Sequence, residues 1–332
     1  RTTRGSGATT VVDWEMGDGW RQQWLAMHFG DDLEINDFGY LGRNDLNYGH
    51  WQVSRRMTDL PEASAYASHD YRGRIIGIDN DSGLRLQRQL RLSRQSDRRD
   101  GGNEYLQLNV NAPGYDDLLT RGGHPLHRPG NFGLSWERNS PRDGNWGWQF
   151  WGWVGSGGLA GNDELGHHLY FRPTYFFSDA LSVFAGASVQ HTPDWLVWQR
   201  DNLVGRFDAR TLELDAGLDW SIGERQELRV KLQTIGLDAR LQQAVVVGPD
   251  GRAVAVEPVG EHHVEDFSLR NLGFQVRYRY MLAPLSDLYI VYGRGGYMLD
   301  AFSTGPVDQL RDSFELRDSE QLLVKLSYRF EI

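Results

Sequence analysis

The 332-residue sequence contains no cysteine, so it has neither a disulfide framework nor thiol chemistry. It also lacks a long apolar run. The longest uncharged stretch, residues 144–162, is rich in glycine and tryptophan and is typical of an aromatic strand, not of a lipid-spanning helix. A basic excess is missing too. The net charge is -10, from 45 acidic and 35 basic residues, which argues against a nucleic-acid partner.

Linker-like segments are also missing. No proline- or serine-rich run, charge block or shift in composition divides the chain, so we expect residues 1–332 to form a single domain. No signal peptide is recognisable before the first strand-like segment, and the sequence begins with Arg1. We therefore expect this chain to be the C-terminal part of a longer protein or a mature form.

The most informative segment that is present comprises residues 322–332. Every even position is apolar, and four of the five odd positions are polar or charged. A period of two places the two sets on opposite faces of a β-strand. Such a terminal strand would close an outer-membrane β-barrel, although a soluble β-sandwich uses the same pattern.

The same alternation recurs along the chain, which favours the barrel. Several of the alternating runs reach 10 to 14 residues, whereas strands in globular sheets usually have about 5–6 and tilted membrane strands need about 9–11. The sequence therefore predicts an all-β fold, an antiparallel transmembrane barrel of about 14–16 strands. The clearest runs are residues 84–93, 106–111, 132–137, 181–189, 212–220, 228–232 and 272–280.

One of these runs predicts which side chains face which environment. We expect Leu228, Val230 and Leu232 to face lipid, and Arg229 and Lys231 to face the lumen. The overall composition agrees with this division, because a mean hydropathy of -0.55 is expected when half of each strand faces a polar lumen. The 12 Trp, 14 Tyr and 14 Phe residues fit the interfaces of a membrane, but they also fit a soluble carbohydrate-binding β-domain.

Short and long connections are expected to alternate, as they do between the two sides of an outer-membrane barrel. The longer connections are predicted at residues 112–130, 156–165, 191–205, 239–266 and 298–318. Several connections are acidic, as at residues 79–81, 116–117 and 261–266. Such loops would hold divalent cations beside lipopolysaccharide, or they are simply solvated.

Three groups of residues resemble a known family. Residues 34–46, residues 115–126 with 128–130, and residues 284–292 with 325–330 are similar to segments of uncharacterised bacterial outer-membrane barrels that follow a family-9-like carbohydrate-binding domain. The resemblance implies a bacterial outer-membrane location, a C-terminal barrel and a link to glycan binding or uptake. It implies no catalytic residue, because that family has no settled activity.

The long connection at 112–130 carries the candidate ligand residues. Arg121, His124, His127 and Arg128 lie there beside two glycines and a proline. Such a loop would fold into the lumen as a constriction and bind an anionic or sugar ligand. The alternative is a glycine-proline turn that only shapes the loop.

Four other patterns suggest chemistry but lack its requirements, so no catalytic, cofactor-binding or metal-binding residue and no cofactor is assigned. Residues 155–160 fit a Gly-x-Gly-x-x-Ala template without the helix and the acidic residue that a dinucleotide needs. Residues 79–83 resemble the start of a calcium loop, but Leu90 replaces its distal glutamate. The histidine pairs at 167–168 and 262–263 would point to opposite faces of a strand.

Three classes of function remain open. The first is an outer-membrane pore or anchor whose partners are lipid, lipopolysaccharide, the barrel-assembly machinery and glycans; Leu326, Tyr328 and Phe330 would form its assembly signal. The second is an outer-membrane lipase or protease, which needs a Ser/His/acid group that no spacing singles out. The third is a soluble, tryptophan-rich carbohydrate-binding domain. The sequence favours the first class and leans against an enzyme.

Overall fold

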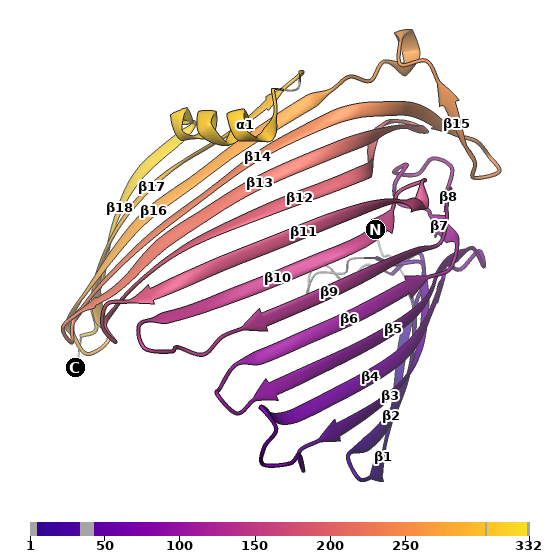
Figure 1. The fold of residues 1–332 in the computed structure, drawn as a ribbon. Helices are drawn as coiled ribbons and strands as arrows, with labels where there is room; N and C mark the ends of the chain where they lie inside the picture. The colour runs from indigo at the N-terminus through magenta and orange to yellow at the C-terminus, as the bar shows by residue number, and fades with distance from the viewer. Residues whose placement is uncertain (1–4, 34–42, 303, 331–332) are drawn as a thin grey trace.

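The computed structural model describes residues 5–33, 43–302 and 304–330, and these form a long, curled antiparallel sheet (Figure 1). Within these residues the sheet has 16 strands, and every hydrogen-bonded pair of neighbours is antiparallel. The prediction of an all-β antiparallel fold is confirmed. No helix in the described ranges is long and apolar enough to cross a membrane.

The strands follow one another along the sheet in chain order. They are β1 (Gly7–Gly17), β2 (Trp20–Phe29), β3 (Leu46–Met57), β4 (Tyr66–Asp79), β5 (Arg85–Arg98), β6 (Asn103–Asn111), β9 (Asn131–Asn139), β10 (Trp146–Gly157), β11 (Gly161–Phe176), β12 (Leu181–Arg200), β13 (Leu203–Ile222), β14 (Gln226–Val247), β16 (Phe267–Ala283), β17 (Ser286–Asp300) and β18 (Ser319–Ser327). The short strand β15 (Ala253–Val256) pairs only with β14. A separate hairpin consists of β7 (Gly114–Asp116) and β8 (Leu126–Arg128), and the helical elements are η2 (Gly260–His262), α1 (Pro306–Asp312) and η3 (Ser313–Glu315).

The connections lie at two rims. The turn rim carries the connections β1–β2, β3–β4, β5–β6, β9–β10, β11–β12, β13–β14 and β16–β17, and the loop rim carries the others. Residues 112–130, 248–266 and 301–318 connect strands at the loop rim. The predicted connection at residues 191–205 is wrong, because these residues lie mostly in the tall strands β12 and β13. The one predicted at 239–266 is wrong in its first part, because residues 239–247 belong to β14. Backbone pairing continues through these segments in spite of register shifts between Thr192 and Trp195 and between Arg206 and Phe207.

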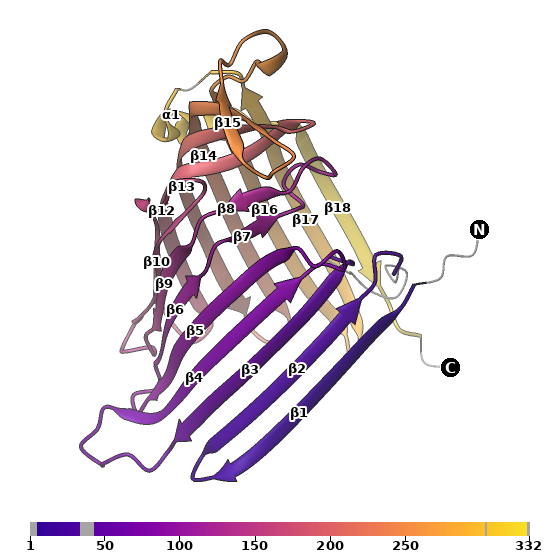
Figure 2. The same cartoon turned by 90° about the vertical axis from the view of Figure 1, so that its right-hand side faces the viewer.

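The sheet curls so that β1 and β18 lie on the same side of the molecule (Figure 2). We call the convex face, on which α1 lies, the outer face, and the concave face the inner face. Cross-strand register shows which residues share the outer face. One row of neighbours on that face runs through Leu106, Trp136, Gly152, Leu169, Val189, Leu212 and Gly236.

Apolar side chains cover most of the outer face and remain exposed. Ile75 is 54% exposed, Leu92 44% and Leu214 39%. The predicted division along β14 is confirmed in its geometry. Val230 is paired with Leu218 and Val276 on the outer face, whereas Lys231 is paired with Gly217 and Gln275 on the inner face. Exposed apolar area on this scale is unusual for a monomeric protein in water.

The apolar outer surface has a defined height. Along β13 its outer positions are apolar from Leu212 to Trp220 and become charged at Arg210 and Asp208, towards the loop rim. At about 3.3 Å per residue, the apolar stretch is roughly 26 Å long. We call this region the apolar belt.

Near the loop rim, a segment of the β17–β18 connection covers the outer face. Helix α1 and η3 lie over β14 and β16, where Gln309 is buried and its amide donates to Ser268 Oγ at 2.9 Å. Arg270 Nη1 donates to Gln309 Oε1 at 3.0 Å. An added Cβ at Gly236 would collide with the helix backbone, so glycine permits this close approach. Gln309 therefore pairs with outer polar groups that the segment covers, Ser268 and the Nη1 of Arg270.

The two edge strands differ from the others. Every residue of β1 and of β18 is exposed, and within the described residues β1 pairs only with β2 and β18 only with β17. A closed barrel is therefore not observed. The last strand is also shorter than predicted: β18 ends at Ser327, and Ile332 lies outside the described residues.

Candidate functional site

The inner face contains a cavity of about 630 Å³ whose lining combines charged, polar and apolar side chains. Strands β11 to β14 and β16 to β18 contribute its lining, which includes Tyr170, Arg172, Glu213, Asp215, Lys231, Gln233, Gln275 and Gln321. These residues lie on the inner face because, along their strands, they alternate with the residues of the apolar belt. Within this lining Gly273 is an open position, since an added Cβ there would meet no atom within 4 Å.

Hydrogen bonds already organise the acidic residues of this cavity. Tyr170 Oη donates to Asp215 Oδ1 at 3.0 Å, and Gln233 Nε2 donates to Glu213 Oε1 at 2.5 Å. The Arg172 guanidinium lies beside Tyr170 and is 4.9 Å from the centre of the Phe184 ring. Carboxylates, amides and cations in one cavity provide both donors and acceptors, which suit a hydroxyl-rich or zwitterionic solute.

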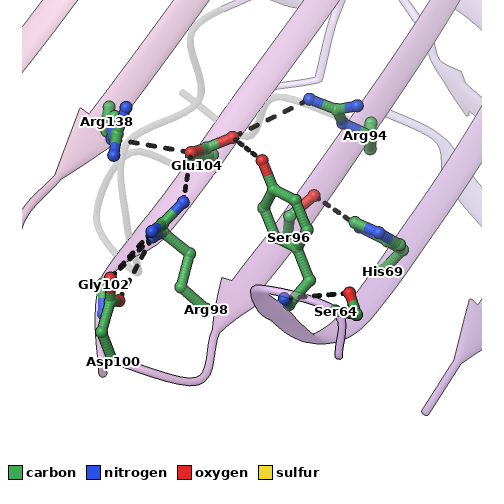
Figure 3. A network of polar contacts seen from close by, with 10 residues as sticks. Ser64, His69, Arg94, Ser96, Arg98, Asp100, Gly102, Glu104 and Arg138 are labelled. Atoms are coloured by element: carbon green, nitrogen blue, oxygen red, sulfur yellow. Dashed lines mark hydrogen bonds and ion pairs between the residues drawn. The ribbon is translucent and has the colours of Figure 1, made fainter. Parts of the chain in front are cut away.

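A second polar group lies on the outer face near the turn rim, below the apolar belt (Figure 3). Glu104 accepts a hydrogen bond from Tyr66 Oη at 3.0 Å and forms ion pairs with Arg98 at 3.4 Å and Arg138 at 3.5 Å. Arg94 approaches the same carboxylate at 3.9 Å. Glu104 shares its face with Leu106, so the outer surface changes from apolar to charged within one alternation along β6. This group limits the apolar belt at its turn-rim end.

A serine-histidine pair lies beside this group, on adjacent strands. His69 Nδ1 and Ser96 Oγ are 2.8 Å apart (Figure 3). The serine is 1% exposed, and no acidic side chain among the described residues contacts the histidine ring. A nucleophile that substrate cannot reach, with no group to orient its base, does not make the arrangement of a hydrolase. The pair therefore joins two strands.

The predicted ligand loop folds over the opening of the curled sheet at the loop rim, which we call the mouth. From its position between β6 and β9, loop 112–130 reaches strands β13 and β14, where Leu126 is fully buried against Val204, Val245 and Val247. His127 N donates to Gly251 O at 2.8 Å, in the β14–β15 connection. Buried apolar contact and backbone hydrogen bonds both fix the loop across the loop rim.

The four predicted residues of this loop do not converge on one point. Arg121 lies over the Trp198 ring at 4.3 Å from its centre, and the backbone N–H of His124 donates to Asn202 at 2.6 Å. The His127 ring packs against Tyr115 at 5.1 Å between ring centres. Arg128 forms an ion pair with Asp116 at 3.2 Å.

These contacts explain the fold of the loop. Arg121 adopts a φ of 51°, in the left-handed region, and Gly122 follows it with a φ of 99°. Such a turn fits the alternative interpretation, in which the glycine-proline segment only shapes the loop. The proposed ligand role of the four residues remains a prediction.

An ion pair that the sequence did not reveal holds the loop at its other end. Both guanidinium nitrogens of Arg43 contact Asp117, at 2.8 and 2.5 Å, and Asn80 lies 3.4 Å from the same carboxylate. Burial acts to raise the pKa of Asp117, but the hydrogen bonds and charge of Arg43 outweigh it and hold that pKa below its ordinary value. The partners are 74 residues apart in sequence, so no local signal pointed to the pair. The family-like residues 34–42 just before Arg43 lie outside the described residues.

The predicted assembly residues lie at the free edge. Leu326 is the last outer residue of β18, and Tyr328 and Phe330 follow the end of that strand. The two rings are 4.9 Å apart and strongly exposed, at 53% and 79%. Arg329 N still donates to Ser286 Oγ at 3.0 Å, so the segment continues beside β17.

The glycine-rich segment 155–160 forms a strand end and a tight turn. The buried carboxylate of Asp194 accepts hydrogen bonds from Leu159 N and Ala160 N at 2.6 and 2.5 Å, and Arg206 Nε approaches it at 2.8 Å. The turn leads directly into β11, so no helix follows it, and the dinucleotide interpretation fails on geometry. Residues 79–83 form the expected hairpin turn, in which Leu84 N donates to Asn80 Oδ1 at 2.8 Å.

Comparison with known proteins gives a family and no function. A solved structure that resembles the chain is a loop L8 deletion mutant of OmpT, an outer membrane protein of Vibrio cholerae. It has 9% sequence identity and a TM-score of 0.29, over 89% of this chain and 95% of that one, and this similarity is too low to carry an argument. No curated protein matches the chain. A family described as "Domain of unknown function (DUF5916)" matches residues 2–331, so the chain belongs to the DUF5916 family.

Proposed function

We propose that this chain is an outer-membrane β-barrel protein whose apolar belt faces lipid and whose inner face forms a polar lumen. The observation that carries the proposal is the belt itself. It is apolar, exposed and bounded by charged residues, Asp208 and Arg210 towards the loop rim and the Glu104 group towards the turn rim. Lipid would cover this area, which water would not favour.

The dimensions support the same proposal. The belt measures roughly 26 Å along β13, or about 20 Å in height after the tilt usual for such strands, near the ~25 Å of an outer-membrane apolar band. Between the two edge strands, antiparallel neighbours also satisfy one another's backbone groups without water, as a membrane requires.

The inner face suits a selective passage or a binding site for polar solutes, such as glycans, better than it suits a wide channel. Loop 112–130 crosses the mouth and is fixed at both ends, through Asp117 and Leu126. The charges on the inner face are of both signs. A solute would therefore pass or bind through hydrogen bonds made one after another, and a strong preference for one charge sign is not expected.

Cell fractionation tests the membrane part of the proposal. The natural protein should be found in the outer-membrane fraction, resist extraction at high pH and migrate differently on gels with and without heating. A soluble protein that binds a glycan column would overturn the proposal. For the lumen, planar-bilayer recordings should give small or brief conductance. A large, steady conductance would refute the occluded mouth.

A further inference from the structure

The two edge strands of the sheet, β1 and β18, run in the same direction and so cannot pair with each other as antiparallel neighbours. Since β15 lies off the main path, fifteen of the 16 strands among the described residues follow one another edge to edge, each antiparallel to the next. With an odd number, the first and last strands are parallel. Both β1 and β18 indeed run from the loop rim to the turn rim (Figure 2).

We propose that a sixteenth strand fills the seam between β1 and β18, and that the polypeptide immediately preceding β1 supplies it. This inference rests on the proposed membrane location. A strand that runs from the turn rim to the loop rim would be antiparallel to both edges. It would join β1 through a hairpin at the loop rim, as consecutive strands commonly do.

The exposed edges favour an occupant over an open seam. Strand β1 has 11 residues and β18 has 9, and all of them are exposed. In a membrane, the unpaired N–H and C=O groups along such edges would have no water to bond with, which strongly disfavours an open seam. Direct pairing of β1 with β18 would satisfy them, but as the one parallel pair in an otherwise antiparallel sheet. Bacterial single-chain barrels have even strand numbers.

The neighbours also define what the missing strand must look like. On the outer face it would lie between Val12 and Trp14 of β1 and Val324 of β18, so its outer residues should be apolar. On the inner face it would lie between Asp13 and Lys325, so its inner residues should be polar. A length of 9 to 11 residues would match both edges.

A sixteenth strand would also place the first and the last end of the barrel at the same rim. Strand β18 ends at the turn rim, and a strand placed before β1 would begin at that rim. A segment that follows β18 would have the right direction as well. The experiment below distinguishes the two sources.

Cysteine cross-linking on the complete gene product tests the inference, because the chain has no cysteine of its own. Pairs such as Asp13→Cys with Leu323→Cys and Asp13→Cys with Lys325→Cys place one thiol on each edge. Neighbouring strands are about 4.8 Å apart, so an intervening strand separates the edges by about 9.6 Å. We expect a reagent that spans about 10 Å to join these pairs and one that spans about 5 Å to fail. The matched control, Val11→Cys with Leu25→Cys, is a cross-strand pair of β1 and β2 that the short reagent should join.

A photo-cross-linker at position 13 identifies the occupant by mass spectrometry. The expected product links β1 to a peptide that precedes it in the same polypeptide. Joining of the edge pairs by the short reagent would overturn the inference in favour of direct parallel closure. A peptide from beyond β18, from an isotopically distinct second copy or from another protein would overturn it as well, and so would no product.

Fractionation of the same cells tests the proposed function separately. Absence from the outer-membrane fraction would defeat the membrane location. Normal membrane insertion together with edges joined by the short reagent would defeat the sixteenth strand alone.

Discussion

A charge placed on the apolar belt should destabilise the protein in a way that depends on the face. Val230 lies between Leu218 and Val276, in the middle of the belt along β14. If this surface contacts lipid, Val230→Lys should cost about 2–4 kcal/mol, as for a lysine near the midplane of a membrane. At about 1.4 kcal/mol per factor of ten, the folding equilibrium should shift roughly 30- to 700-fold.

The adjacent residue provides the control. Lys231 faces the cavity and pairs with Gly217 and Gln275, so Lys231→Val removes an inner charge without touching the belt. Urea titration of both variants in lipid vesicles, followed by heat-modifiable migration, measures the two costs. We expect Lys231→Val to change the free energy of unfolding by less than about 1 kcal/mol. Normal insertion of Val230→Lys with failure of Lys231→Val would show that the faces are inverted.

Three further outcomes follow from the structure. Replacing Tyr328 and Phe330 with Ser removes two exposed rings, each worth about 1.5–3 kcal/mol when covered, and should cause periplasmic accumulation and degradation, which immunoblots of cell fractions would detect. The ion pair with Arg43 holds the pKa of Asp117 below its ordinary value, so the anchor of loop 112–130 should be complete at neutral pH and lost as the pH falls through that lowered pKa. Limited proteolysis should therefore cut the loop only in acid, but already at neutral pH in Asp117→Asn. Removing the buried carboxylate of Asp194 leaves the Nε–H of Arg206 and two backbone N–H groups without their acceptor, and leaves the charge of Arg206 without its carboxylate. Asp194→Ala should therefore lower the unfolding free energy by about 3–5 kcal/mol in denaturant titration.

Alternation predicted the sheet well, because the pattern is a direct consequence of strand geometry. The division between Val230 and Lys231 follows from a period of two and needs no knowledge of neighbours. The approximate strand number follows in the same way. The alternation could not show that the tall strands β12 to β14 continue through residues 191–205 and 239–247. Residues 191–205 include a proline and several polar residues that also suit a loop, and residues 244–247 form an uninterrupted apolar run.

The site was less predictable, because its contacts join distant segments. Arg43 and Asp117 become partners only after the mouth is folded, and Leu126 finds its apolar contacts on β13 and β14. The sequence identified the loop of Arg121 and His124 from its unusual composition, yet the contacts of these residues are with Trp198 and Asn202. The alternation of residues 322–332 predicted a strand that closes a barrel, but within the described residues β18 pairs only with β17. The sequence could not show that β1 and β18 are parallel, since strand direction depends on the complete order of the sheet and not on any one strand.

Contact between the apolar belt and lipid is tested most directly by single-cysteine labelling at two neighbouring positions of β13. Leu214 lies on the outer face and is 39% exposed, whereas Glu213 lines the inner cavity. In outer-membrane vesicles, a polarity-sensitive fluorophore at Leu214→Cys should be quenched by lipids with brominated chains and protected from aqueous iodide. The same label at Glu213→Cys should show the reverse. Iodide quenching at position 214 that equals the quenching at position 213, with no effect of the brominated lipids, would contradict a membrane-spanning sheet.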